Sequence, residues 1–258
     1  MAKTLVITNQ KGGVGKTTTA VNLAASLAAC EQRVLLVDLD PQGNATMGSG
    51  VNKGQLRQSV YHVLLGAAQV AQVRQSAPQG GYDVLPANRE LGGAEIELVD
   101  LAERETRLKV ALAAVADDYD FILIDCPPAL NLLTLNGLVA ADRVMIPMQC
   151  EYFALEGLTD LVNTLRKVRA GLNPQIEIEG LLRTMYDPRS TLAQQVAAQL
   201  KQHFGDKVYN VVIPRNVRLA EAPSHGLPAL VYDKSSKGAQ AYLALAQEML
   251  EKQPAAVA

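Results

Sequence analysis

Short apolar runs alternate with longer, helix-forming stretches along most of the chain. The runs are rich in Val, Ile and Leu and stop at charged or turn residues; they cover Leu5–Thr8, Val34–Asp38, Tyr82–Leu85, Phe121–Asp125, Arg143–Pro147, Glu179–Thr184 and Val208–Ile213. Apolar runs of this length are typical of strands that are buried on both faces of a sheet. Because helical stretches separate the runs, we expect an α/β fold, a mostly parallel, twisted sheet with helices on both faces.

The stretches Thr17–Ala29, Gln55–Ser76 and Gly92–Val115 are expected to be helical. The chain has 258 residues, of which 48 % are apolar and 19 % charged, and no linker-like segment divides it. We therefore expect one domain over residues 1–258, with a short flexible tail from about residue 252. The first residues lead directly into an apolar run, and no apolar stretch approaches the length of a membrane span. These features predict a cytoplasmic protein.

The segment Lys11–Thr17 reads Lys-Gly-Gly-Val-Gly-Lys-Thr and lies between the first apolar run and the first helical stretch. A glycine-rich turn at this place exposes backbone N–H groups to which a polyphosphate binds. The order strand, loop, helix is typical of the phosphate-binding loop of P-loop NTPases, in which Lys16 reaches the β- and γ-phosphates and Thr17 ligates Mg²⁺. We therefore expect ATP to contact Lys11, Gly12, Gly13, Val14, Gly15, Lys16, Thr17 and Thr18.

Carboxylates follow two of the other apolar runs. Asp38 ends one run and is followed by Leu39-Asp40-Pro41, while Asp125 ends the run Phe121–Asp125. Acidic side chains at strand ends beside a phosphate loop suit the coordination of Mg²⁺ or the positioning of water. We expect Asp125 to hold Mg²⁺, directly or through a water, and Asp40 to belong to the same metal and catalytic site. For Asp38 and Asp40, capping of a turn or helix is the alternative.

The phosphate loop departs from the usual G-x-x-x-x-G-K-[ST] pattern, because Gln10 stands where the first glycine belongs. A lysine at position 11 beside two glycines resembles the deviant loop of the ParA/MinD ATPases, in which two subunits enclose two nucleotides. The resemblance implies that Lys11 is a catalytic residue that reaches the partner subunit's phosphates. It also implies that Gly12 lets the two loops approach at the dimer interface, and that Asp40 orients the water that attacks ATP.

Three later segments extend the resemblance to the chromosomal, Soj-type ParA proteins. These segments are Gln149–Gly157, Thr184–Arg189 and Ile213–Ser224, and with the nucleotide motifs they span the chain from about Lys3 to Met249. Pro214 and Asn216 follow a strand where the adenine is expected, so we assign them to base binding. The resemblance implies an ATP-dependent homodimer and a ParB-type centromere-binding partner whose basic segment stimulates hydrolysis. Plasmid relatives carry an extra DNA-reading domain, for which we expect no room before Leu5.

DNA binding has to be argued from local charge, because the whole chain holds 24 basic and 26 acidic residues. Residues 180–237 carry eight basic and four acidic side chains, which leaves 16 basic and 22 acidic ones elsewhere. Such an asymmetry is expected of a surface that meets phosphates. The resemblance implies that Arg189 and Arg218 bind double-stranded DNA without reading its sequence, in association with the nucleoid. Arg215 is expected either to bind DNA or to serve the nucleotide pocket or the dimer interface.

Two other functions share this kind of loop. A MinD-like protein reads a lipid surface through a basic amphipathic C-terminal helix, but residues 248–254 contain a single lysine and a proline. An electron-transferring ATPase of the nitrogenase-reductase type needs two cluster-binding cysteines per subunit, but Cys30, Cys126 and Cys150 lie far apart in the sequence. The sequence therefore favours a switch ATPase that needs ATP and Mg²⁺, binds no membrane and partitions chromosomes or plasmids.

Overall fold

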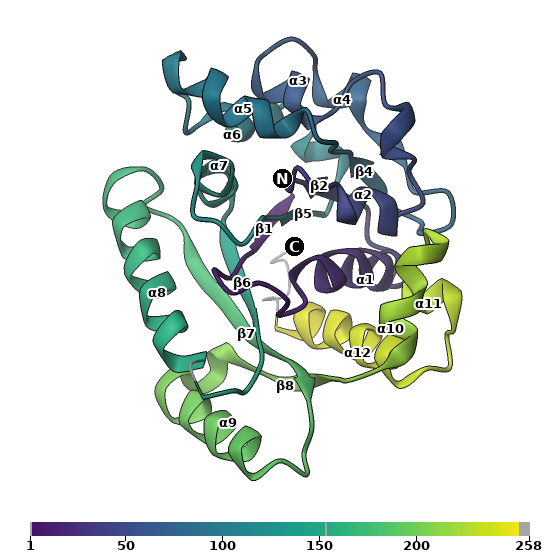
Figure 1. The fold of residues 1–258 in the computed structure, drawn as a ribbon, viewed down its shortest axis with the longest axis vertical. Coiled ribbons are helices and arrows are strands. Elements are labelled where there is room, and N and C mark those ends of the chain that lie inside the picture. Colours follow the sequence, from purple (N-terminus) through teal and green to yellow (C-terminus); the bar gives the residue numbers. More distant parts are fainter. Residues whose placement is uncertain (1, 153, 253–258) are drawn as a thin grey trace, which may run out of the picture.

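The computed structural model describes residues 2–152 and 154–252 and contains one eight-stranded sheet (Figure 1). Apart from Lys252, the expected flexible tail lies outside the described residues. All seven expected strands are present, and a two-residue edge strand that the pattern did not predict joins them. The strands are β1 Lys3–Ile7, β2 Val34–Asp38, β3 Gln75–Ser76, β4 Asp83–Leu85, β5 Phe121–Asp125, β6 Arg143–Met148, β7 Glu177–Tyr186 and β8 Val208–Pro214.

The strand order across the sheet is β3-β4-β2-β5-β1-β6-β7-β8. The short β3 pairs antiparallel with β4, and every other neighbouring pair is parallel. The expected α/β class is therefore confirmed. β1 lies between β5 and β6, so the residues that follow β1 and β5 emerge side by side at the carboxyl edge, where open α/β sheets bind ligands.

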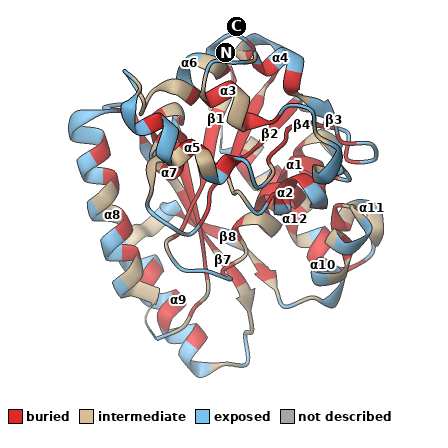
Figure 2. Cartoon of the chain, turned by 45° about the horizontal axis from the view of Figure 1, so that its top comes forward, coloured by how far each residue is buried: buried red, intermediate tan, exposed pale blue. Residues whose placement is uncertain are grey.

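The central strands are buried on both faces (Figure 2). Successive side chains of a strand point to opposite faces, and β1 follows this rule: Val6 packs into the core on one side, while Leu5 and Ile7 pack into the core on the other. Both cores consist mainly of Leu, Val, Ile and Ala, which explains why the strands read as unbroken apolar runs.

Helices cover both faces of the sheet (Figure 1). They are α1 Lys16–Ala29, α2 Asn44–Gly48, α3 Val60–Leu64, α4 Val70–Val73, α5 Leu91–Glu97, α6 Arg107–Ala113, α7 Leu132–Ala140, α8 Ala154–Gly171, α9 Thr191–Phe204, α10 Val217–Glu221, α11 Ala229–Tyr232 and α12 Lys237–Glu251. The stretches Gln55–Ser76 and Gly92–Val115, expected to be helical, are helical only in part, because each is broken into short helices. In the first stretch, Gly66 has a left-handed backbone with φ at 77°, which ends the helix before it. In the second stretch, Glu103 has φ at 53° and interrupts the helix in the same way.

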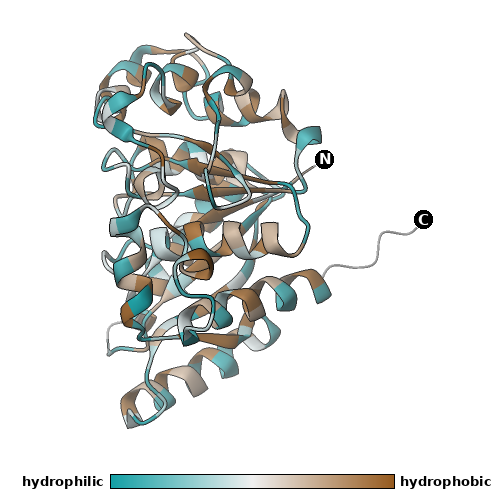
Figure 3. Ribbon diagram, turned by 90° about the vertical axis from the view of Figure 1, so that its right-hand side faces the viewer, coloured by the Kyte–Doolittle hydropathy of each residue, from teal (hydrophilic) through white to brown (hydrophobic). Residues whose placement is uncertain are grey.

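Helices α1 and α12 lie side by side against one face of the sheet (Figures 1 and 3). Their contact includes a hydrogen bond of 3.0 Å between the hydroxyl groups of Thr19 and Tyr242. Tyr242, Leu245 and Met249 of α12 are buried there. In the part of the chain that the structure describes, no helix combines the length and apolar character needed to span a bilayer.

Candidate nucleotide-binding site

Three neighbouring strands bring the predicted motifs together at the carboxyl edge of the sheet. Asp125 at the end of β5 is in register with Ile7 of β1 on one side and with Asp38 of β2 on the other. The phosphate loop follows β1 through residues 8–10, so it emerges beside Asp125, and Asp38 lies one strand further away. The sheet thus brings together motifs that are more than 80 residues apart in the sequence.

The phosphate loop is shaped by two glycines with left-handed backbone conformations. Gly13 has φ at 73° and Gly15 has φ at 86°, values that a residue with a Cβ adopts only at a cost. Gly15 is the N-cap of α1, so the loop leads into the N-terminus of a 14-residue helix. Helix N-termini leave backbone N–H groups unpaired and carry a partial positive charge, which together favour a bound phosphate.

Three polar side chains that sequence analysis did not single out hold this loop. The Asn9 amide donates to the carbonyl of Pro147 at 2.8 Å, and its oxygen accepts from the Lys11 N–H at 3.0 Å. The Thr184 hydroxyl donates to the carbonyl of Val14 at 2.8 Å. Gln149 donates to the carbonyl of Gly13 at 3.4 Å. Gln149 and Thr184 lie in the segments that carry the family resemblance, but nothing in the sequence marked their side chains as loop contacts.

Lys16 is buried, and its ammonium group turns back to the start of the loop, where Nζ donates a hydrogen bond to the carbonyl of Lys11 at 2.9 Å. Burial lowers the pKa of Lys16, and the negative charge of Asp125 opposes that shift. A buried lysine with a carboxylate nearby is suited to bind a second anion. The ammonium group of Lys16 therefore lies at the phosphate loop, with Asp125 nearby.

Asp125 is fully buried, and neither of its carboxylate oxygens has a hydrogen-bond partner among the described residues. Burial raises the pKa of Asp125 well above its usual value, and the charge of Asp38 raises it further. The Thr17 hydroxyl and the Lys16 ammonium act in the opposite direction. Buried polar groups are normally paired, so two buried, unpaired carboxylate oxygens beside a hydroxyl are suited to a cation.

Asp38 and Asp40 both make the turn contacts that the sequence left open as an alternative. Asp38 accepts hydrogen bonds from the N–H of Asp40 at 3.1 Å and from the N–H and hydroxyl of Thr46 at 2.8 and 2.7 Å. Asp40 is partly exposed, and its Oδ1 accepts from the N–H of Gln42 at 2.9 Å. Asp38 is thus used in holding α2. Oδ2 of Asp40 forms no hydrogen bond to the described residues and stays available.

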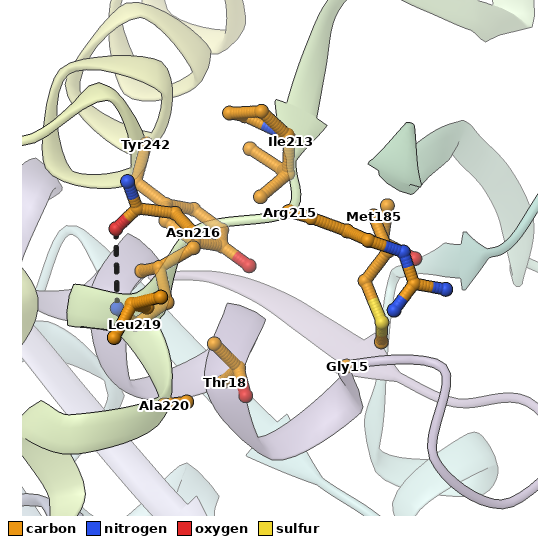
Figure 4. A pocket seen from close by; sticks show the side chains of 12 residues that line it. Gly15, Thr18, Met185, Ile213, Arg215, Asn216, Leu219, Ala220 and Tyr242 are labelled. Atoms are coloured by element: carbon orange, nitrogen blue, oxygen red, sulfur yellow. Dashed lines mark hydrogen bonds between the residues drawn. The ribbon is translucent and has the colours of Figure 1, made fainter. Parts of the chain in front are cut away.

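A cavity of about 390 Å³ opens beside Gly15 and Thr18, and its walls are mostly apolar. Pro214 and Asn216 line it, and Figure 4 shows Asn216 accepting a hydrogen bond from the N–H of Leu219 at 3.3 Å. Asn216 is therefore also the N-cap of α10. The other lining residues are Thr184, Met185, Ile213, Arg215, Val217, Leu219, Ala220 and Tyr242. An apolar cavity with few polar groups next to a phosphate loop fits a nucleobase.

Lys11 and Gly12 lie on the outer side of the loop. Lys11 is exposed, and its ammonium pairs with Glu151 at 2.5 Å. Gly12 is exposed as well, and a Cβ added to it would meet no atom within 4 Å. Within one subunit, nothing near Gly12 requires a glycine.

The three predicted DNA-binding arginines are distributed over two neighbourhoods. Arg189 pairs with Asp187 at 2.9 Å and holds the pKa of Asp187 down to about 2, and Arg215 acts on Asp187 in the same direction. Arg218 instead pairs with Glu221 and Asp233 at 2.8 and 3.3 Å. Arg215 also lines the nucleotide cavity, and Figure 4 shows its side chain extending past Met185, away from Asn216.

Comparison with known proteins agrees with this geometry. Residues 2–178 match a family model described as an AAA domain. The chain is 57 % identical over 249 residues to the sporulation initiation inhibitor protein Soj of Bacillus subtilis, with 96 % of this chain and 98 % of that protein covered. It is 53 % identical over 253 residues to the chromosome partitioning protein ParA of Caulobacter vibrioides, with coverages of 97 % and 95 %.

A similar solved structure is cobyrinic acid a,c-diamide synthase of Mycobacterium smegmatis, in which an ATP analogue and magnesium are bound. The two folds agree with a TM-score of 0.85 at 39 % identity, over 97 % of this chain and 95 % of the other.

Proposed function

The chain belongs to the ParA (Soj-type) family of chromosome-partitioning ATPases, and we propose that it is an ATP-driven switch that dimerises, binds DNA without reading its sequence and partitions chromosomes or plasmids. The observation that carries the nucleotide part is the unpaired, buried carboxylate of Asp125 beside Thr17 and Lys16. Soj and ParA relatives bear names of partitioning proteins, and the solved neighbour holds an ATP analogue with magnesium.

In this proposal the adenine occupies the cavity beside Pro214 and Asn216, and the phosphates lie on the N–H groups of residues 12–18. Lys16 leaves the carbonyl of Lys11 and binds the β- and γ-phosphates, since a charged acceptor gives a stronger hydrogen bond than a carbonyl does. The 390 Å³ cavity and the phosphate loop adjoin at Gly15 and Thr18, so one nucleotide reaches both.

Thr17 and Asp125 would hold Mg²⁺, directly or through water. The described residues contain no group of three or more His, Cys, Asp or Glu side chains that could hold a metal. This agrees with Mg²⁺ sites in NTPases, where one or two protein ligands act together with phosphate oxygens and water. When bound, Mg²⁺ neutralises phosphate charge and keeps the γ-phosphate in position.

Asp40 is the residue that we propose to orient the attacking water. Its main-chain turn is fixed by the contact to Asp38, while Oδ2 faces no donor among the described residues. A carboxylate oxygen that is held in place but not used can accept a proton or a hydrogen bond from a water molecule. We expect Asp40 to complete the metal site only in the closed dimer.

Dimer closure is assigned to Lys11 and Gly12. Both lie at the outer rim of the loop, and the space around Gly12 is open within the subunit. A small residue that its own subunit does not require is explained if a second subunit approaches it. Lys11 then exchanges the carboxylate of Glu151 for the phosphates of the nucleotide in the other subunit.

DNA binding is assigned to Arg189, Arg215 and Arg218. Each has an exposed or partly exposed side chain and belongs to the basic region 180–237. A single subunit offers few contacts to phosphate, but a dimer doubles them, and the second set binds at a high effective concentration. Closure of the dimer with ATP would therefore increase the affinity for DNA, and hydrolysis of ATP would release the DNA.

A ParB-type protein is proposed as the partner that stimulates hydrolysis. The names of the Soj and ParA relatives support a partition system, and a switch that releases DNA on hydrolysis needs a signal that times this step. A membrane-reading role like that of MinD finds less support. On α12, Tyr242, Leu245 and Met249 are buried beside α1 and β8, and the remaining apolar residues, such as Leu243 and Leu250, are partly buried, so the helix presents no strongly exposed apolar face.

The substitution Asp125→Asn tests the nucleotide part. Asn has almost the same size but no charge, so the variant should lose the tightening of ATP binding by Mg²⁺. The free energy of unfolding at neutral pH without nucleotide should rise, because burial disfavours the ionised form of Asp125 and Asn has no group to ionise. Titration calorimetry with and without Mg²⁺ measures the first effect, and urea denaturation measures the second. Unchanged Mg²⁺ dependence would contradict the assignment of Asp125.

A further inference from the structure

The end of β6 and the connection that follows it contact the start of the phosphate loop and the segment before it at three points. Pro147 accepts a hydrogen bond from Asn9, Gln149 donates to the carbonyl of Gly13, and Glu151 pairs with Lys11 at 2.5 Å. Two of these contacts involve a backbone carbonyl, that of Pro147 in β6 or that of Gly13 in the loop. The third differs in kind, because it occupies the ammonium group of Lys11.

The ion pair between Lys11 and Glu151 can open and close, because both side chains lie at the surface. Its side chains are 46 % and 47 % exposed, so water can replace either partner when they separate. Exposed ion pairs shift an equilibrium only modestly, by roughly 1.4- to 5-fold. The loop itself does not depend on this pair, since Asn9, Gln149 and Thr184 already fix its backbone.

We propose that Glu151 is a positioning residue that keeps Lys11 on its own subunit until the nucleotide-bound dimer closes, and so sets how readily the dimer forms. This inference rests on the proposed function, in which Lys11 binds phosphates across the interface. Lys11 cannot serve both anions at once, because a single ammonium group at 2.5 Å from Glu151 has to move away to reach another subunit. Closure of one dimer therefore breaks two of these pairs.

The expected change in the dimerisation constant follows from the two Lys11–Glu151 pairs that closure breaks. If each pair favours the open subunit by roughly 1.4- to 5-fold, breaking two pairs lowers the dimerisation constant by about 2- to 25-fold. Glu151→Gln keeps the size of the side chain but removes its charge. We expect the variant to form the ATP-analogue dimer at a protein concentration about 2- to 25-fold lower than the native chain.

The experiment compares native chain, Glu151→Gln and a control, Asp160→Asn, by sedimentation with Mg²⁺ and a slowly hydrolysed ATP analogue. Asp160 is an exposed carboxylate on the following helix, α8, and contacts no residue of the phosphate loop through its side chain. The control should dimerise like the native chain. The affinity for Mg·ADP, measured by calorimetry, should be equal in all three, because an open subunit binds ADP without moving Lys11.

A dimerisation constant that is unchanged or lower in Glu151→Gln would overturn the inference, the second result showing that Glu151 holds Lys11 ready for the partner. A changed affinity for Mg·ADP would also overturn it, because Glu151 would then support the loop rather than restrain Lys11. If the native chain forms no dimer with the ATP analogue, the proposed function fails instead.

Discussion

Asp38 and Asp125 are directly opposite one another on the neighbouring parallel strands β2 and β5, and both are fully buried. Their surroundings differ in one respect. Asp38 accepts three hydrogen bonds from Asp40 and Thr46, whereas Asp125 accepts none from the described residues. Asp38 therefore fixes the turn that carries Asp40, and the unpaired oxygens of Asp125 fit the cation-binding role that we propose for it.

Burial makes the stability of the chain depend on the protonation of Asp38. It raises the pKa of Asp38 to about 6, against about 3.9 in an unfolded chain, with the hydrogen bonds from Thr46 opposing the shift. A carboxyl with a raised pKa stabilises the fold below the unfolded value, and this contribution is lost as the pH rises through about 6. Its full size is up to about 3 kcal/mol.

We therefore expect the free energy of unfolding of the native chain, measured relative to Asp38→Asn, to decline between pH 4 and pH 7. Urea denaturation at a series of pH values, without nucleotide or metal, measures both chains under the same conditions. Two parallel pH profiles would show that Asp38 does not carry this dependence.

Gly12→Val should separate nucleotide binding from dimerisation. The added side chain meets no atom within 4 Å in its own subunit, and the backbone of Gly12 is not left-handed. ATP affinity should therefore stay within about twofold of native, while the ATP dimer should be lost. The comparison variant is Gly13→Val. Because Gly13 has φ at 73°, a valine there would strain the loop backbone, and nucleotide binding should fall. Calorimetry and sedimentation give the two readouts, and a Gly12→Val chain that dimerises normally would contradict the interface.

Asp40→Ala should leave the ATP-bound dimer intact but unable to hydrolyse. If Asp40 orients the attacking water, phosphate release should fall roughly 100-fold or more, and the dimer should remain on DNA. Asp206→Ala serves as the control, because Asp206 is exposed and lies in the short turn before β8. Phosphate release at the native rate in Asp40→Ala would remove the residue from the catalytic role.

The strands and the phosphate loop could be predicted because local signals are strong there. Leu5, Val6 and Ile7 are all buried, and the glycines at 13 and 15 have the backbone conformations that the loop requires. Contacts between distant segments were not predictable. Nothing in the sequence around Glu151 shows that its side chain meets Lys11, and the edge strand β3 is too short to leave a pattern.

The division of the predicted helices has a similar cause. Val60–Leu64 and Val70–Val73 both form helices. Gly66 ends the first of them, and the antiparallel pairing of β3 with β4 ends the second. Asn216 shows the opposite case, in which a residue assigned to base binding also caps α10, a role that depends on where the helix starts.

The most direct test of the account is the affinity for a long DNA duplex of arbitrary sequence, with Mg·ADP and with an ATP analogue, at several salt concentrations. We predict binding only with the ATP analogue. If Arg189 and Arg218 of both subunits each neutralise one phosphate, log affinity should fall with log salt at a slope of about −3 to −4. Arg218→Ala should weaken binding, whereas Arg143→Ala should not. Arg143 begins β6, at the end of the strand opposite the nucleotide site, and its side chain pairs with Glu177. Equal binding with both nucleotides, or a flat salt response, would contradict an ATP-dependent DNA switch.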